Sequence, residues 1–238
     1  MLNSFKRSLK NYLKNRSDKQ ELVNAYGALP LFKLPTVTLG NPKYGAWTLC
    51  PRELNASSVV YSIGVGEDIS FDRELCEKYG VQLFTFDPTP RSITFMAQQT
   101  LLPNFHFVPL GIADHNGTAN FFPPQHIDHV SHSFLEVSTR SPIAVEVKTL
   151  SSLMALNQHT HLSLLKMDIE GAEYQVLDQI FTENVQIDQL LVEFHDRFPT
   201  IGRSKTLDTI QHILAADYSL FAISPSYEEF SFIHHRAL

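Results

Sequence analysis

The chain has 238 residues, of which 43% are hydrophobic and only 18% are charged. This composition excludes an intrinsically disordered chain and is typical of a globular protein with a sizeable core. The net charge of −6, from 19 basic and 25 acidic residues, argues against a protein that coats nucleic acid, because such a protein needs a basic surface.

The cysteine content and the hydropathy predict a cytoplasmic protein. Cys50 and Cys76 are the only cysteines and do not form a C-x-x-C pair, so neither a disulfide scaffold nor a cysteine zinc site is expected. No stretch approaches the roughly 18 consecutive apolar residues of a membrane-spanning helix. The N-terminus also lacks the apolar run of a secretory signal.

Residues 1–20 are predicted to form a basic amphipathic helix. Leu2, Phe5, Leu9 and Leu13 recur at helical spacing, and six basic residues against one acidic residue give this segment a charge of +5. We expect the narrow apolar stripe to pack on the rest of the protein or on a second subunit in a homodimer. The alternative is a weak peripheral contact with anionic lipid. Residues 1–50 are thus read as a helix and lead-in, and 51–238 as a single domain.

The remaining chain alternates between strands and helices, which predicts a doubly wound α/β fold. Gly80 is the expected C-cap of one helix, and Thr89 with Pro90 opens another. The last two strands are joined by a short turn and must be antiparallel to each other. Strands are predicted at 47–49, 58–63, 82–86, 105–109, 144–148, 162–167, 189–193, 218–224 and 229–235. Helices are predicted at 69–79, 90–99, 172–181 and 205–216.

Residues 111–149 interrupt this alternation and form an insertion. Asn116-Gly117 predicts a hairpin turn near its start, because both residues tolerate the left-handed backbone that such turns need. The strand predicted at 144–148 closes the insertion.

A ligand site is expected where the first strands of the doubly wound sheet end. Gly64 and Gly66 follow the strand at 58–63, and Asp87 follows the next strand, 23 residues after Gly64. Glycines let a backbone turn tightly against a ligand, and an acidic residue at this second position can accept hydrogen bonds from both ribose hydroxyls.

The charge of the glycine loop favours S-adenosylmethionine over NAD. A dinucleotide site needs a third glycine, which is here replaced by Ile69. Glu67 and Asp68 place negative charge where a pyrophosphate would lie, whereas they suit a sulfonium and an amino group. Asp68 can in addition compensate the dipole of the following helix.

Four sequence blocks together resemble the FkbM-type family of class I, S-adenosylmethionine-dependent methyltransferases. They are VVYSIGVGEDISFD at 59–72, FDPTP at 86–90, KMDIEGAE at 166–173 and VEFH at 192–195. The likeness spans about 45–200. It implies a Rossmann-like, seven-stranded mixed sheet with helices on both faces and an antiparallel last strand. It also implies O-methylation, often of sugar hydroxyls, and places residues 111–114, with Ile112, beside the adenine.

An alcohol acceptor needs a base or a metal ion that favours loss of its proton. Asp168 and Glu170 are expected to orient the acceptor hydroxyl or to hold a divalent metal, although no metal site is predicted. Glu173, in a first helical turn, is expected to serve the helix dipole. His195 lies between Glu193 and Asp196, and a carboxylate neighbour raises the pKa of a histidine and fixes its tautomer. We therefore interpret His195, Asp168 and Glu170 as the catalytic candidates.

Other interpretations remain open from the sequence. The segment containing His126, Asp128, His129 and His132 lacks cysteine and a helix to fix its geometry, so we expect a loop over the acceptor pocket rather than a zinc site. The rival functions are an NAD-dependent oxidoreductase and a non-catalytic module that binds the cofactor or a partner. The expected partner is a saccharide or small-molecule acceptor, without nucleic acid.

Overall fold

The computed structural model describes residues 20–43, 45–122, 141–198 and 200–238. The predicted helix at 1–20 lies almost entirely outside the described residues, and the segment with His126, Asp128, His129 and His132 lies wholly outside them. Residues 20–26 are helical. Within the described ranges, no helix is both long and apolar enough to cross a membrane.

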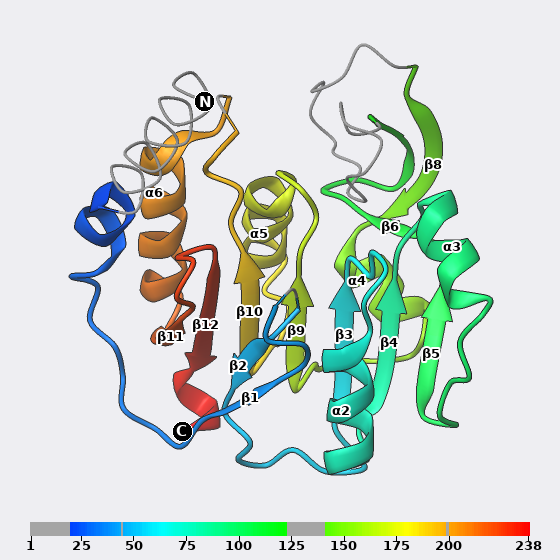
Figure 1. Ribbon diagram of the computed structural model, residues 1–238, viewed down its shortest axis with the longest axis horizontal. Helices are drawn as coiled ribbons and strands as arrows, with labels where there is room; N and C mark the ends of the chain where they lie inside the picture. Colours follow the sequence, from blue (N-terminus) through cyan, green and yellow to red (C-terminus); the bar gives the residue numbers. More distant parts are fainter. Residues whose placement is uncertain (1–19, 44, 123–140, 199) are drawn as a thin grey trace, which may run out of the picture.

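The centre of the molecule is a seven-stranded mixed sheet in the order β11-β12-β10-β9-β3-β4-β5, as the resemblance implied (Figure 1). β3, β4, β5, β9 and β10 are parallel, and the last strand, β12, runs antiparallel between β10 and β11. The strands of this sheet are β3 (Val59–Ile63), β4 (Gln82–Phe86), β5 (Phe105–Val108), β9 (Leu164–Met167), β10 (Gln189–Glu193), β11 (Tyr218–Ile223) and β12 (Glu229–His234).

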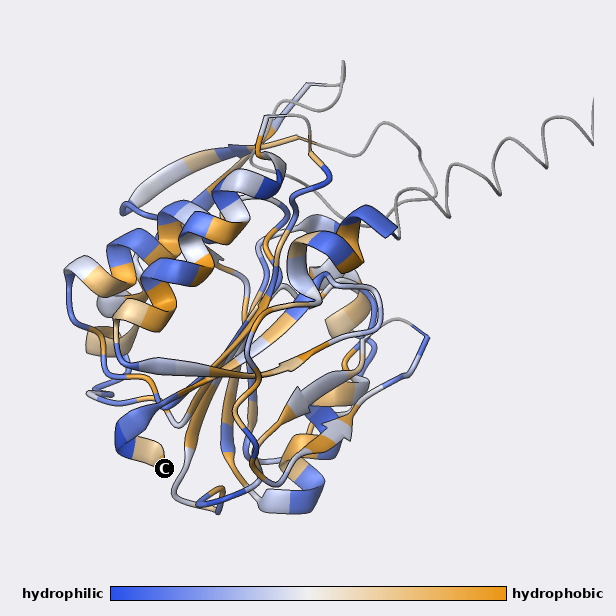
Figure 2. Cartoon of the chain, turned by 90° about the vertical axis from the view of Figure 1, so that its left-hand side faces the viewer, coloured by the Kyte–Doolittle hydropathy of each residue, from blue (hydrophilic) through white to orange (hydrophobic). Residues whose placement is uncertain are grey.

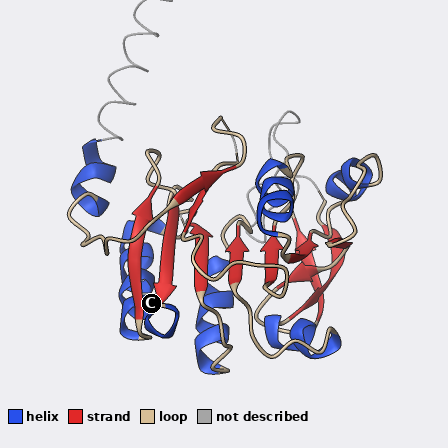
Figure 3. Ribbon diagram, turned by 90° about the horizontal axis from the view of Figure 1, so that it is seen from below, coloured by secondary structure: helices blue, strands red, loops and turns tan. Residues whose placement is uncertain are grey.

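Helices cover both faces of this sheet, which confirms the doubly wound fold (Figure 3). One face carries α4, α5 and α6, whose apolar residues pack in the larger core cluster. The other face carries α2 and α3, and beside them lies a ribbon of β1 and β2. The bounds are α2 (Ser70–Tyr79), α3 (Pro90–Met96), α4 (Leu150–Leu156), α5 (Glu173–Thr182), α6 (Gly202–Ala215), β1 (Val37–Leu39) and β2 (Trp47–Leu49), with a final 3-10 turn η1 (His235–Ala237).

The local signals for helix ends act as expected. Gly80 caps α2 in the left-handed conformation with a φ of 70°. The Thr89 side chain accepts a hydrogen bond from the Ser92 N–H at the start of α3, with Pro90 in the first helical position. The central strands are almost wholly apolar (Figure 2), and Cys50 and Cys76 are buried as free thiols beside them.

The insertion and the segment that follows it each differ from the prediction. It forms a second sheet in the order β6-β8-β7, from β6 (Gly111–Ile112), β7 (Gly117–Phe121) and β8 (Ile143–Lys148). The hairpin predicted at Asn116-Gly117 is wrong, because β6 and β7 do not pair with each other but flank β8. Asn116 instead accepts a hydrogen bond from the Thr149 N–H and donates one to the Ser152 hydroxyl.

The second difference is α4, which the sequence analysis did not predict. No element was predicted directly after the strand at 144–148, but the Thr149 side chain accepts a hydrogen bond from the Ser152 N–H and caps a seven-residue helix. Leu150, Leu153 and Met154 of this helix are buried against the sheet. α6 also begins earlier than expected, at Gly202.

Candidate functional site

The site lies at the carboxyl ends of the parallel strands, where the strand order reverses between β3 and β9. A ligand crevice is expected at such a switch point. One cavity opens there, which we call the Asp87 cavity. Its walls contain six residues predicted to bind cofactor or acceptor: Gly64, Gly66, Asp87, Ile112, Asp168 and Glu170. They come from four different strand ends, and the fold brings them together as the sequence analysis expected.

Asp87 organises the wall of this cavity through five hydrogen bonds. Its Oδ2 accepts from the N–H groups of Val65 (3.0 Å) and Gly66 (3.1 Å) and from the Ser92 hydroxyl (2.8 Å). Its Oδ1 accepts from the Thr89 N–H (2.9 Å) and hydroxyl (2.7 Å). A carboxylate offers about four lone-pair positions. Ribose hydroxyls could therefore bind Asp87 only by displacing some of these donors.

Only glycine fits at position 64, because of its backbone conformation and because another backbone segment lies close to it. Its φ is +85°, and a Cβ atom there would lie 1.9 Å from the carbonyl oxygen of Asp168. The Gly64 carbonyl accepts a hydrogen bond of 2.6 Å from the Lys166 ammonium, which is buried in β9 and lies 5.3 Å from the centre of the Trp47 ring. Lys166 was missed by the sequence analysis, although a lone cation within the apolar run SLLKM marks it.

Glu67 and Asp68 do not line the Asp87 cavity. They face a second cavity on the other side of the glycine loop at 64–68. We call it the Trp47 cavity, because Trp47 lines it together with Lys166 and Glu193. Glu67 pairs with Arg91 at 2.9 Å, and Asp68 accepts a hydrogen bond of 2.7 Å from the Ser70 N–H at the start of α2. Gly64, Gly66 and Asp168 belong to the walls of both cavities and so lie between them.

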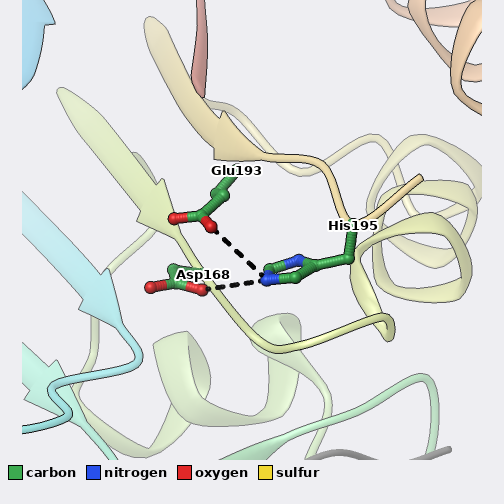
Figure 4. A group of neighbouring side chains, drawn as sticks. All are labelled: Asp168, Glu193 and His195. Carbon is green, nitrogen blue, oxygen red and sulfur yellow. Dashed lines mark ion pairs between the residues drawn. The ribbon is translucent and has the colours of Figure 1, made fainter. Parts of the chain in front are cut away.

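His195 is completely buried, and four carboxylates approach its ring, two of which, Asp168 and Glu193, are drawn in Figure 4. Its Nε2 lies 3.3 Å from Glu170 Oε2, 3.5 Å from Glu193 Oε1 and 3.6 Å from Asp168 Oδ1. Its Nδ1 lies 2.7 Å from Glu173 Oε1. Within the described ranges, neither ring nitrogen has a hydrogen bond of normal geometry. The imidazole is therefore held by charge contacts, with the Nδ1 side and the Nε2 side facing different carboxylates.

Glu173 has a larger role than the predicted one at the helix dipole. It does stand in the first turn of α5, but its side chain is fully buried. Its carboxylate accepts hydrogen bonds from the N–H groups of Ile169 and Gly171 while it contacts His195. Glu173 thus fixes the turn before α5 and the position of the His195 ring together.

The turn itself directs Glu170 toward the imidazole. Glu170 and Gly171 both have a left-handed backbone, with φ values of 51° and 106°. Such a conformation at a residue other than glycine costs about 1–2 kcal/mol and is often found at functional sites. Arg197, which was not among the predicted site residues, lies at the exposed rim of the His195 cluster. Its guanidinium approaches Glu170 and Glu193, each at 3.7 Å.

Asp196 does not belong to this cluster. From its place in the sequence it was expected to act on the pKa of His195, but its Oδ2 accepts a hydrogen bond of 2.5 Å from the Tyr26 hydroxyl. Arg203 approaches the same carboxylate at 3.8 Å. Asp196 therefore anchors the helix at 20–26, and the charges that act on His195 come from β9, β10 and the start of α5.

The surrounding carboxylates change the protonation of the cluster. Burial lowers the pKa of His195, but Glu173, Glu170 and Asp168 outweigh it and raise that pKa to about 11. Burial, followed by the charge of Asp168, raises the pKa of Glu193 to about 8. Burial also raises the pKa of Asp168, against the charges of Lys166 and His195. In this arrangement His195 keeps its proton at neutral pH.

We expect the free energy of unfolding to fall as the pH rises from 7 to 8.5 in buffer containing EDTA. The pKa of His195 rises from 6.5 to about 11 on folding, so its stabilising contribution is complete below 6.5 and is lost as the pH approaches 11. Glu193, raised from 4.5 to about 8, acts in the same direction. The slope should approach about 1.4 kcal/mol per pH unit for each proton.

Urea denaturation at several pH values measures this slope. Staying below pH 8.5 limits the contribution of the buried Cys76 thiol, whose pKa burial raises to about 12. A free energy of unfolding that stays constant or rises over this range would contradict the charge distribution described for the cluster.

Comparisons with known proteins point to one family. The family model described as the methyltransferase FkbM domain matches residues 40–220. A probable methyltransferase-like protein 24 from Homo sapiens is 24% identical over 172 residues, and the one from Rattus norvegicus is 28% identical over 142 residues. These alignments cover 68% and 59% of this chain but only 41% and 33% of the relatives.

A solved structure is also similar. It is the crystal structure of methyltransferase FkbM from Methylobacillus flagellatus KT, with a TM-score of 0.49 and 14% sequence identity. The match covers 76% of this chain and 44% of that chain.

Proposed function

Because this chain belongs to the FkbM methyltransferase family, we propose that it transfers a methyl group from S-adenosylmethionine to a hydroxyl group of a saccharide or glycosylated small molecule. The observation that carries this proposal is the position of Asp168. It lies in the wall of the Asp87 cavity and, at the same time, 3.6 Å from the buried His195. A cofactor cavity and a proton-handling cluster thus share one residue.

The residues present fit this cofactor. No lysine or arginine occurs among the described residues that line the Asp87 cavity, so a pyrophosphate would meet no positive charge there. Asp87, Asp168 and Glu170 border it instead, and Glu67 and Asp68 lie beyond the glycine loop in the Trp47 cavity. Glu67 is paired with Arg91 and Lys166 also lines the Trp47 cavity, but the carboxylates outnumber these cations and favour a cationic ligand. The adenosyl group would occupy the Asp87 cavity beside Ile112, with the amino-acid end toward Glu67 and Asp68.

When bound, S-adenosylmethionine supplies a methyl group that is activated by its sulfonium. Asp168 and Glu170 would then orient the acceptor hydroxyl, and His195 would accept its proton at Nε2. To do so, His195 must first pass the proton that it holds at neutral pH to a neighbouring carboxylate, of which Glu170, 3.3 Å from Nε2, is the nearest. A positive charge bound against Asp168 favours this loss, because it offsets the carboxylate field that raises the pKa of His195. Glu173, at Nδ1, would keep the ring in place.

Binding of S-adenosylhomocysteine tests the cofactor assignment. A ligand that binds only the native state at about 100 times its Kd stabilises it by about 2.7 kcal/mol. We therefore expect S-adenosylhomocysteine to raise the Tm in a thermal-shift assay and NAD to leave it unchanged. Stabilisation by NAD alone would favour the oxidoreductase, and stabilisation by neither ligand would contradict the proposal.

The acceptor requires a separate experiment. The protein is incubated with S-adenosylmethionine labelled in its methyl group and with extracts of cell-envelope glycans. We expect label in a saccharide fraction that depends on the intact protein. Binding of S-adenosylhomocysteine without any transfer to these extracts would favour a binding module or a different acceptor class over a saccharide methyltransferase.

A further inference from the structure

Asp168, Glu193 and His195 enclose a small gap at the ends of β9 and β10 (Figure 4). One donor atom from each lies within 4.8 Å of the other two. The Nε2 of His195 is 3.6 Å from Asp168 Oδ1 and 3.5 Å from Glu193 Oε1. Both distances exceed the ~2.7–3.2 Å of a hydrogen bond. They match the ~3.4 Å edge of a tetrahedron of ligands at ~2.0–2.2 Å from a metal ion.

The imidazole gives an independent reason to expect an occupant in this gap. His195 is completely buried and its Nε2 points between the two carboxylates. Carboxylates lie near both ring nitrogens, but neither nitrogen makes a hydrogen bond of normal geometry with a residue that the structure describes. Buried polar groups are nearly always partnered. We propose that Asp168, Glu193 and His195 bind a divalent transition-metal ion through two carboxylate oxygens and Nε2.

Glu173 completes this arrangement from the far side of the ring. Metal-binding histidines usually place their second nitrogen against a carboxylate, which fixes the ring and makes it a better ligand. Glu173 Oε1 lies 2.7 Å from Nδ1 and is itself held by the Ile169 and Gly171 N–H groups. The ligand set therefore has an outer carboxylate that cannot swing away.

The donor types indicate which ions the site takes. One imidazole and two carboxylates suit Mn²⁺ or Zn²⁺ better than Mg²⁺, which prefers an all-oxygen set. Three protein ligands leave at least one coordination position open, as in catalytic rather than structural sites. Asp168 and Glu193 both line the Trp47 cavity, and 32% of the Asp168 side chain is exposed. The open position therefore faces space that a small molecule can enter.

The use of the ion rests on the proposed function, whereas its binding does not. A metal ion lowers the pKa of a coordinated hydroxyl. An ion at this site would hold the acceptor hydroxyl next to Asp168. Nε2 of His195 would then be a ligand, so Glu170, in the wall of the Asp87 cavity, would take the hydroxyl proton in its place. A proton competes with the metal ion for Nε2. When the proton is bound there, the Glu170 carboxylate, at 3.3 Å, balances the positive charge of the imidazolium.

Metal titration of the full chain tests the proposal without any turnover. The protein is treated with EDTA, dialysed, and titrated with Mn²⁺ and with Zn²⁺ in a calorimeter; Co²⁺ absorption reports the coordination. We expect saturable binding of one ion per chain. Asp168→Asn and Glu193→Gln should weaken it by more than the ~10–100-fold expected for Glu173→Gln, because loss of an outer-shell partner costs that much.

Glu228→Gln is the matched control. Glu228 pairs with Arg197 at 2.8 Å near the same rim but is not one of the three ligands, so its variant should bind the ion as the natural chain does. Far-UV circular dichroism checks that each variant is folded. Failure of Mn²⁺ and Zn²⁺ to bind at millimolar concentration, or binding that is unchanged in both Asp168→Asn and Glu193→Gln, would overturn the proposal.

The same protein samples separate this proposal from the proposed function. Binding of S-adenosylhomocysteine without any ion binding would contradict the metal site and support the proposed methyltransferase function. The opposite result is ion binding that depends on Asp168 and Glu193, without binding of S-adenosylhomocysteine. It would support the metal site and contradict the proposed cofactor.

Discussion

Replacing His195 by glutamine is expected to lower kcat by about 10²–10⁴-fold, the range that a positioned acid–base group contributes. The affinity for S-adenosylhomocysteine should change little, because His195 is not among the residues that line the Asp87 cavity. The expectation holds whether Nε2 accepts the acceptor proton or binds a metal ion, since glutamine does neither as an imidazole does. Single-turnover rates and calorimetry measure the two quantities separately.

The control for this variant is His161→Gln. His161 is half-exposed and precedes β9, at the amino ends of the parallel strands and so away from the candidate site. It pairs there with Asp188 at 2.9 Å. It should keep the natural rate. Removal of a buried charge costs stability as well, on the order of 3–5 kcal/mol, so binding of S-adenosylhomocysteine also shows that the His195 variant is folded. An unchanged kcat would limit His195 to a structural role.

The sequence predicted the central sheet well because its inner strands, β3, β9 and β10, are buried on both faces. The stretches SVVYSI and QLFTF are rich in β-branched and aromatic residues and contain no charged residue, and the helices that follow them carry clear end signals at Gly80 and Thr89. The insertion was harder to predict because its contacts are not local. Asn116 favours a turn in isolation, but its side chain binds the backbone of Thr149, 33 residues away.

The sequence predicted which residues belong to the candidate site better than it predicted the contacts between them. Parallel strands end at one edge, so Gly64, Asp87, Asp168 and His195 could be expected to lie near one another. Whether a carboxylate in a first helical turn faces solvent or the interior is set by the turn before it. The left-handed Glu170-Gly171 turn directs Glu173 inward to His195, and no periodicity in the sequence reports that.

Replacing Gly64 by alanine should destabilise the protein by more than about 4 kcal/mol, a loss reserved for severe backbone or packing conflicts. Two costs add at this position. Its φ of +85° is unfavourable for alanine, and the new Cβ would lie 1.9 Å from the Asp168 carbonyl oxygen. That oxygen belongs to the backbone at the switch point between β3 and β9. It cannot move without displacing the Asp168 side chain that both cavities share.

Gly66→Ala separates the two costs, because Gly66 shares the left-handed backbone but not the close neighbour. Its φ is +57°, and a Cβ there would have nothing within 4 Å. We therefore expect only the conformational cost of about 1–2 kcal/mol, with the N–H contact to Asp87 retained. Urea denaturation of both variants gives the difference. Equal losses would mean that the approach of Gly64 to Asp168 does not constrain the site, because only that approach distinguishes the two glycines.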